Sequence, residues 1–180
     1  MKYGKTLFPL IFPDRLDLIG KNIQGISNNR FSKRFHQLCP CDAKRLSLPS
    51  NSIHLSFSYS VLEHVDDPES VIQEQFRVLK PGGTAVHNIA LLDHKHMEAK
   101  PLEFLTYPKG ELEIGHTYCN KWRAGDFVRA FRKAGFHVRK TIVDQKIRIT
   151  KAMRKEIHTD FRCHSDNDLS ILGITIITGK

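Results

Sequence analysis

The segment from residue 42 to residue 83 constrains the fold more than any other part of the chain. Residues 53–59 combine apolar, β-branched and aromatic side chains with small hydroxyls, which is typical of a strand packed on both faces. Asp67 and Pro68 then supply an N-cap and a first helical residue, and an apolar stripe follows them. The Lys-Pro-Gly-Gly run at 80–83 ends this helix with a tight turn. The order of strand, helix, turn and strand predicts an α/β fold.

The remainder of the chain continues this alternation. The expected elements are a strand at 84–92, a helix at 122–134, a strand at 136–143, a helix at 149–159 and a strand at 169–178. With 180 residues and 40% hydrophobic content, the chain can bury one sizeable core. We therefore expect a single domain over residues 1–180, built on an open, mostly parallel sheet.

The ordered residues of the first segment resemble those of class I S-adenosylmethionine-dependent methyltransferases, in the group that includes methyltransferase type 11-like domains. The matching positions are Asp42-Ala43, Leu48-Pro49, Asn51-Ser52, Ser60 to Val65, Asp67-Pro68 and Arg77 to Gly83. The resemblance is specific for the family and implies a Rossmann-like sheet whose last two strands, 136–143 and 169–178, form an antiparallel hairpin at its edge. It says little about the substrate, because this scaffold serves many acceptors.

The resemblance implies S-adenosylmethionine as the cofactor. The positions it assigns to cofactor binding are Asn22, Asp42, Ala43, Tyr59, Ser60 and Glu63. Asp42 would accept a hydrogen bond from the adenine amino group, although a solvated acid beside Lys44 is the alternative. Asn22 stands where the family has an acid for the ribose hydroxyls, and an amide lacks the charge that strengthens such bonds.

His64 is the candidate catalytic residue. It follows a strand end that would face the ligand crevice, where a histidine near neutral pH could take a proton from an acceptor hydroxyl or amine. The alternative is that Glu63 and His64 only orient the loop, since methyl transfer from a sulfonium depends chiefly on positioning. No metal is predicted, because Ser60 replaces the first acid of the Glu-x-x-Glu-His set that some relatives use, and no carboxylate or thiolate is placed to complete a site with His87, His94 and His96.

The chain has no acidic residue followed by a glycine-rich x-G-x-G-x-G loop, with which the family's cofactor site begins. In the register that places Asn22 after the second strand, Met1 falls just after that loop. We therefore expect an N-terminally truncated domain that lacks its first strand. Such a sheet would have unpaired edges, which predicts marginal stability, weak cofactor binding and possible self-association through a strand edge.

The methyl acceptor is expected to be an O or N atom on a small molecule or a carbohydrate-linked substrate. Acceptor contacts in this fold come from insertions, and residues 93–118 are the candidate here, with a polar surface loop as the alternative. The candidate lining residues are His94, His96, Phe104, Tyr107, His116 and Tyr118.

The net charge of +9 supports a different hypothesis, that of an inactive remnant or a basic module for an anionic partner such as nucleic acid. Ten basic residues gather near the carboxyl terminus. They are Arg129, Arg132, Lys133, Arg139, Lys140, Lys146, Arg148, Lys151, Arg154 and Lys155. We favour a solvated face, because no aromatic residues interleave with them as a base-stacking platform and no nucleic-acid motif appears. The absence of a long apolar run and of a secretory signal in the sequence predicts a cytoplasmic protein.

Overall fold

The computed structural model describes residues 42–110 and 118–180, which belong to one compact unit running from Cys41 to Lys180. Asn22 and the segment expected to hold the second strand lie outside the described residues, as does His116. The expectations that concern a truncated amino terminus and a lost first strand therefore stay predictions.

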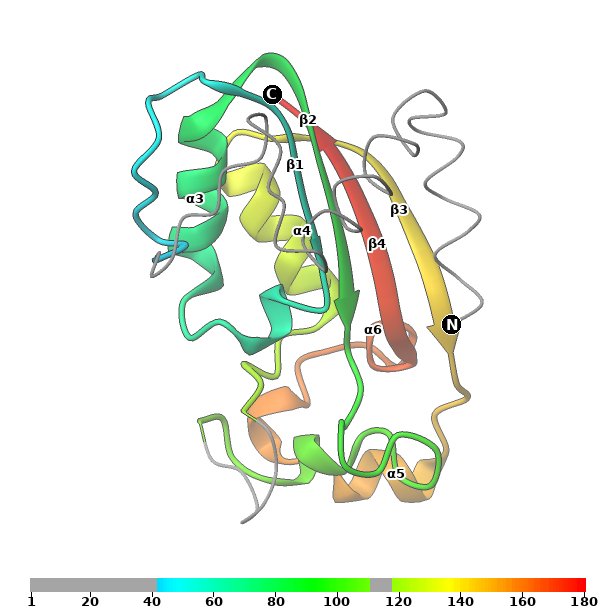
Figure 1. Ribbon diagram of the computed structural model, residues 1–180. Helices are drawn as coiled ribbons and strands as arrows, with labels where there is room; N and C mark the ends of the chain where they lie inside the picture. Colours follow the sequence, from blue (N-terminus) through cyan, green and yellow to red (C-terminus); the bar gives the residue numbers. More distant parts are fainter. Residues whose placement is uncertain (1–41, 111–117) are drawn as a thin grey trace, which may run out of the picture. The chain divides into compact units, whose positions relative to one another are not determined.

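The described residues form a four-stranded sheet with the order β1 (Ile53–Tyr59), β2 (Leu79–Ala90), β4 (Ile171–Gly179) and β3 (His137–Lys146) (Figure 1). β1 pairs with β2 in parallel, and β4 runs antiparallel to both β2 and β3. Three strands thus share one direction, which confirms the mostly parallel α/β sheet. The predicted antiparallel pairing of the last two strands is also confirmed.

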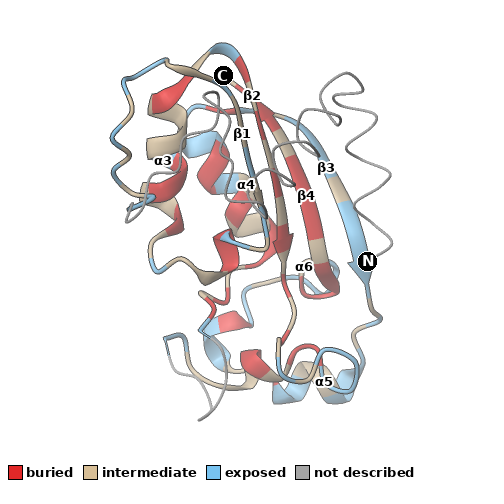
Figure 2. Cartoon of the chain, in the orientation of Figure 1, coloured by how far each residue is buried: buried red, intermediate tan, exposed pale blue. Residues whose placement is uncertain are grey.

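Two helices, α3 (Pro68–Val78) and α4 (Ala124–Lys133), pack on one face of this sheet (Figure 1). Asp67 caps α3 as predicted, its Oδ1 accepting a hydrogen bond from the Ser70 amide at 3.1 Å, and Pro68 is the first helical residue. The sheet residues beneath the helices are fully buried, which Figure 2 shows along β2 and β4. This layer is the main core of the unit.

β1 differs from the expectation of a strand packed on both faces. Its Phe57 and Tyr59 side chains are 60% and 66% exposed in the described structure. The described helices cover the other face, where Ser58 Oγ lies 2.8 Å from Nδ1 of the buried His87. The apolar composition of a strand therefore did not by itself determine how many of its faces are covered.

A second core lies beyond the carboxyl ends of β1 and β2 (Figure 1). It joins the insertion after β2 to the insertion between β3 and β4. The short elements that build it are η3 (Glu103–Thr106), α5 (Lys151–Glu156), η4 (Thr159–Phe161) and α6 (Asp166–Leu169). The helix predicted over 149–159 is thus shorter, because Ile157 takes an extended conformation and buries its side chain in this core.

The Lys-Pro-Gly-Gly run is the other difference. The sequence predicted that a strand resumes at residue 84, whereas β2 already begins at Leu79. The pairing with β1 shifts from Ile53–Leu79 to Leu55–Thr84, so the two glycines sit in an irregularity of the ladder. Gly82 adopts φ +77° and donates its amide to the Lys180 carbonyl at 2.8 Å.

Within the described residues, no helix combines the length and the apolar composition that a membrane span requires.

Gly135, which ends α4, provides a stability prediction. It has φ +101°, and an added Cβ would lie 2.9 Å from Cζ of Phe76. Gly82 has a positive φ too, but an added Cβ there would meet nothing within 4 Å. Gly82→Ala should therefore cost about 1 kcal/mol from backbone strain alone, whereas Gly135→Ala should cost about 2 kcal/mol or more because the clash adds to it. Urea unfolding of both variants tests this, and equal losses would contradict it.

Candidate active site

The turn that follows β1 holds three of the predicted site residues, Ser60, Glu63 and His64. Ser60 lies in the left-handed region at φ +50°, and its amide donates to the Asn88 carbonyl at 3.0 Å, which ties the turn to β2. The 3-10 helix η2 (Leu62–His64) follows, with Leu62 and Glu63 buried. A parallel strand end therefore delivers His64 to the edge of the sheet, as the sequence predicted.

Asn120 holds this turn in place from a segment that is distant in sequence. Its Nδ2 donates to the carbonyls of Leu62 at 2.7 Å and Val65 at 3.0 Å, and its backbone amide donates to the Glu63 carbonyl at 2.8 Å. His64 Nδ1 lies 2.7 Å from the Tyr118 carbonyl oxygen in the same segment. These hydrogen bonds of Asn120 were not predicted, because an isolated Asn before a helix belongs to no sequence pattern that indicates contacts with a distant turn.

A pocket of about 450 Å³ opens beside this turn. It is lined by Asp42, Ala43, Lys44, His64, Val65, Asp66, Val71 and Tyr118. The structure thus brings Asp42 and Ala43, two of the predicted cofactor residues, to the same pocket as the predicted base His64. Tyr59, Ser60 and Glu63 do not line it.

The rim of the pocket carries an ion pair. Lys44 Nζ lies 3.1 Å from Asp66 Oδ2, and their hydrogen bond raises the pKa of Lys44 and lowers the pKa of Asp66. The Lys44 amide also donates to Asp42 Oδ1 at 2.9 Å. The pocket therefore combines charged and polar groups with the apolar side chains of Ala43, Val65 and Val71, as small-molecule sites usually do.

Glu63 lies behind the pocket with only 3% of its surface exposed. Its Oε1 accepts a hydrogen bond from the Ala90 amide at 3.3 Å, while its Oε2 has no hydrogen-bond partner among the described residues. Burial raises the pKa of Glu63, against the opposing effects of hydrogen bonds and of His64. Glu63 thus supports the end of β2, and this position favours the alternative in which it orients the loop.

His94 packs edge-on against His64, with the ring centroids 4.7 Å apart. Burial lowers the pKa of His94, and the neighbouring His64 lowers it further. His94 follows Asp93, whose Oδ1 accepts the amides of Lys95 at 2.7 Å and His96 at 3.0 Å. This turn directs the chain after β2 toward η2.

The other candidate acceptor residues are not gathered at the pocket. Tyr118 lines the pocket, but Phe104 is buried in the second core at 3% exposure, so the expectation that it lines an acceptor site is corrected. His96 pairs with Glu103 at 3.5 Å. The Tyr107 ring lies 5.8 Å from Lys121 Nζ, away from the pocket residues. A hydrophobic residue in an insertion can be buried in a core or can line a ligand site, and the sequence alone did not distinguish these two positions.

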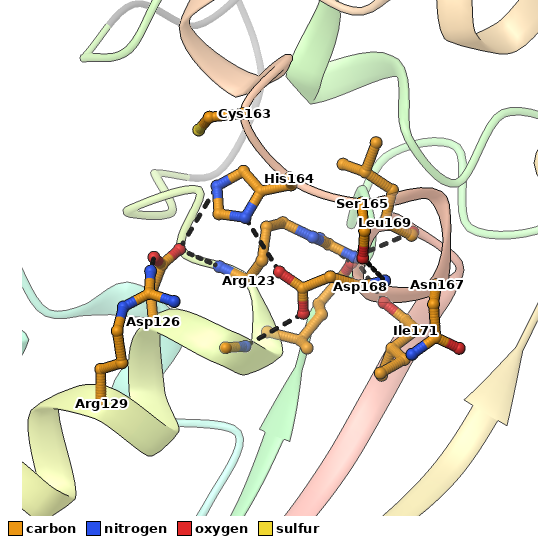
Figure 3. A network of polar contacts seen from close by, with 12 residues as sticks. Arg123, Asp126, Arg129, Cys163, His164, Ser165, Asn167, Asp168, Leu169 and Ile171 are labelled. Carbon is orange, nitrogen blue, oxygen red and sulfur yellow. Dashed lines mark hydrogen bonds and ion pairs between the residues drawn. The ribbon is translucent and has the colours of Figure 1, made fainter.

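Arg123 links the two cores at the carboxyl edge of the sheet. It is fully buried, donating to the Leu91 carbonyl at 2.7 Å, the Leu169 carbonyl at 3.2 Å and the Ile171 carbonyl. Burial lowers its pKa to about 10, so the guanidinium stays charged at neutral pH. Beside it, His164 lies 2.9 Å from Asp168 Oδ2 (Figure 3). This network joins the segment after β2 to the end of α6 and the start of β4.

Comparisons with known proteins agree with this arrangement. Residues 15–87 match the family model described as a methyltransferase domain. An arsenite methyltransferase from Aquipseudomonas alcaligenes is 30% identical over 124 residues, covering 69% of this chain and 34% of that protein. A ubiquinone/menaquinone biosynthesis C-methyltransferase from Desulfotalea psychrophila is 37% identical over 67 residues, covering 37% of this chain and 27% of that protein. The chain thus spans about a third of the length of these curated relatives.

Among solved structures, a similar fold occurs in the complex between the Haloferax volcanii Trm112 methyltransferase activator and a methyltransferase. The TM-score is 0.55 at 18% sequence identity, and the match covers 87% of this chain and 66% of that chain. At this identity the likeness concerns the fold alone.

Proposed function

Since this chain is a member of the class I S-adenosylmethionine-dependent methyltransferase family by sequence and by fold, we propose that its 450 Å³ pocket binds S-adenosylmethionine and serves methyl transfer. The observation that carries the proposal is that Asp42 and Ala43 share this pocket with His64. The cofactor supplies, when bound, a methyl group activated on a sulfonium. The chain's own residues then have to bind it, orient an acceptor and accept a proton.

The pocket residues fit the adenine end of the cofactor. Asp42 offers a carboxylate for the adenine amino group, and Ala43, Val65 and Val71 offer an apolar surface beside the Tyr118 side chain. The volume of about 450 Å³ lies within the range of small-molecule sites. We also propose that the affinity is weaker than micromolar, because the sequence has no glycine-rich cofactor loop and has Asn22 at the ribose position.

His64 is the proposed base. A carbonyl oxygen can only accept, so Nδ1 of His64 donates to the Tyr118 carbonyl, and Nε2 of the neutral ring is left as the proton acceptor. A hydroxyl or amine in the pocket could pass its proton there as the methyl group arrives. This chemistry favours an O or N acceptor on a small molecule or carbohydrate-linked substrate. Two relatives are named for arsenite methylation and for C-methylation, so the acceptor panel in the test below includes arsenite and carbon acceptors.

Replacing His64 tests this role. With methyl-labelled S-adenosylmethionine and a panel of acceptors, we expect His64→Ala to lower kcat about 100-fold. KM for the cofactor should change little. His158→Ala is the matched control, because His158 lies at η4 in the second core region. Full activity in His64→Ala would exclude the role of His64 as the base.

The basic residues give weaker support to a nucleic-acid module. They come from α4, β3, α5 and, for Arg148, the segment between β3 and α5. Three of them, Arg129, Lys133 and Arg154, pair with Asp126, Glu69 and Asp166. We therefore expect no salt-sensitive band shift with single-stranded or double-stranded nucleic acid. A shift at low salt that disappears steeply as salt rises would support the module instead.

A further inference from the structure

We propose that Glu63, His64 and His94 form a binding site for a divalent transition-metal ion, with Zn²⁺ as the best match. The structure offers one ligand atom from each residue, and these three atoms lie within 4.8 Å of one another. Ligands of a tetrahedral zinc ion lie about 3.4 Å apart, so closure by about 1 Å would complete the set. Side-chain rotation alone can supply a change of this size.

Two buried polar atoms of the Glu63–His64–His94 cluster have no hydrogen-bond partner among the described residues. Glu63 Oε2 and His94 Nε2 are buried and have no hydrogen-bond partner within residues 42–110 and 118–180. Only 3% of the Glu63 surface is exposed. Nearly all buried polar atoms in proteins are paired, and a carboxylate oxygen and an imidazole nitrogen in one cluster are typical metal ligands. A bound cation would satisfy both at once.

His64 has the orientation that metal-bound histidines need. Its Nδ1 donates to the Tyr118 carbonyl at 2.7 Å, which fixes the tautomer in which Nε2 carries the lone pair. An ion bound at Nε2 would occupy the lone pair that the proposed base uses, so His64 would act as a ligand or as a base, but not as both at once. Such a hydrogen bond to a backbone carbonyl is the usual outer contact of a histidine ligand. Asn120 in turn holds the η2 backbone that carries both Glu63 and His64. The ligand set is therefore largely preorganised.

The donor types select the class of metal. Two imidazoles and one carboxylate suit zinc, and the same set also occurs in non-haem iron(II) sites, whereas magnesium and calcium prefer oxygen ligands. Three protein ligands leave a position for water or for an oxygen donor of a substrate. His64 also lines the 450 Å³ pocket, so an ion here would be reached from that pocket. No metal was predicted from the sequence, because Ser60 replaces the first acid of the Glu-x-x-Glu-His set to which Glu63 and His64 belong, and no local pattern brings His94, thirty residues beyond His64, to the same place.

Calorimetric titration of Zn²⁺ into the full chain, previously treated with a chelator, tests the site. We expect one ion per chain, and we expect Glu63→Gln and His94→Ala each to weaken binding at least tenfold. His96→Ala is the matched control and should bind like the wild type, because His96 lies two residues after His94 and pairs with Glu103 instead. Co²⁺ substitution adds a readout of geometry, since visible absorption bands of a low-coordinate ion should disappear in His94→Ala.

Two outcomes would overturn the site. One is a lack of saturable Zn²⁺ binding in the wild type, and the other is equal binding in Glu63→Gln and His94→Ala, which would place the ion elsewhere, for example on cysteines. Circular dichroism of each variant confirms that it is folded, and His94→Asn serves as a second, less disruptive change. The titration needs neither S-adenosylmethionine nor an acceptor, so its result is independent of the proposed activity.

Discussion

Replacing Arg123 with alanine should lower the free energy of unfolding by about 3 to 5 kcal/mol. The guanidinium is fully buried and donates to three carbonyls: that of Leu91 directly after β2, that of Leu169 at the end of α6 and that of Ile171 at the start of β4. Truncation would leave these carbonyls without donors and would open a cavity between the two cores. Each unsatisfied buried carbonyl costs about 1 to 3 kcal/mol, and relaxation around the cavity recovers part of this loss.

Arg129→Ala is the matched control for this experiment. Arg129 also contacts Asp126, but its side chain is 68% exposed, so we expect its loss to change stability by no more than about 0.5 kcal/mol. Arg123→Lys should recover only part of the stability, because a single ammonium cannot replace the planar fork of donors. Urea unfolding measures all three variants. A loss below about 1 kcal/mol in Arg123→Ala would show that the network does not join the cores.

The second large effect concerns pH and the buried His87. Burial lowers its pKa from 6.5 to about 4, and its ring stacks on Phe131 with the centroids 5.2 Å apart. Between these two pKa values the unfolded chain binds a proton that the folded protein does not bind. The stability that His87 contributes is therefore fully present above pH 6.5 and is lost as the pH falls toward 4. The loss from this residue should reach about 3 kcal/mol.

A variant isolates this dependence. In His87→Leu the difference in unfolding free energy between pH 7 and pH 4 should shrink by about 3 kcal/mol relative to the wild type. His54→Leu, a change at an exposed histidine of β1, should leave that difference unaltered. Urea unfolding at a series of pH values provides the comparison. Parallel pH profiles for His87→Leu and the wild type would contradict the assignment.

The fold was largely predictable because its determinants are local. The Asp67-Pro68 pair begins α3, Gly135 with its positive φ ends α4, and the β-branched run near the carboxyl terminus forms β4. Each of these features works within a few residues of its own position, so a sequence pattern can indicate it. The antiparallel pairing of the last two strands came from the family resemblance rather than from local patterns.

The site was predictable only in part, since its contacts join distant segments. The resemblance predicted Asp42 and His64 as site residues, and both line the pocket. The contact of His94 with His64, and the hydrogen bonds of Asn120 to the η2 turn, connect segments with no shared periodicity. The second core likewise depends on two insertions meeting, which buried Phe104 where an exposed acceptor contact was expected.

Calorimetric titration of S-adenosylhomocysteine into the full chain tests the central claim most directly, which is that the pocket shared by Asp42 and His64 holds the cofactor. We predict saturable binding with a dissociation constant above about 1 µM, weakened at least tenfold in Asp42→Ala, a loss of about 1.4 kcal/mol. Asp144→Ala, on β3 away from the pocket, should bind like the wild type. No saturable binding, or equal affinity in the wild type and Asp42→Ala, would contradict the claim.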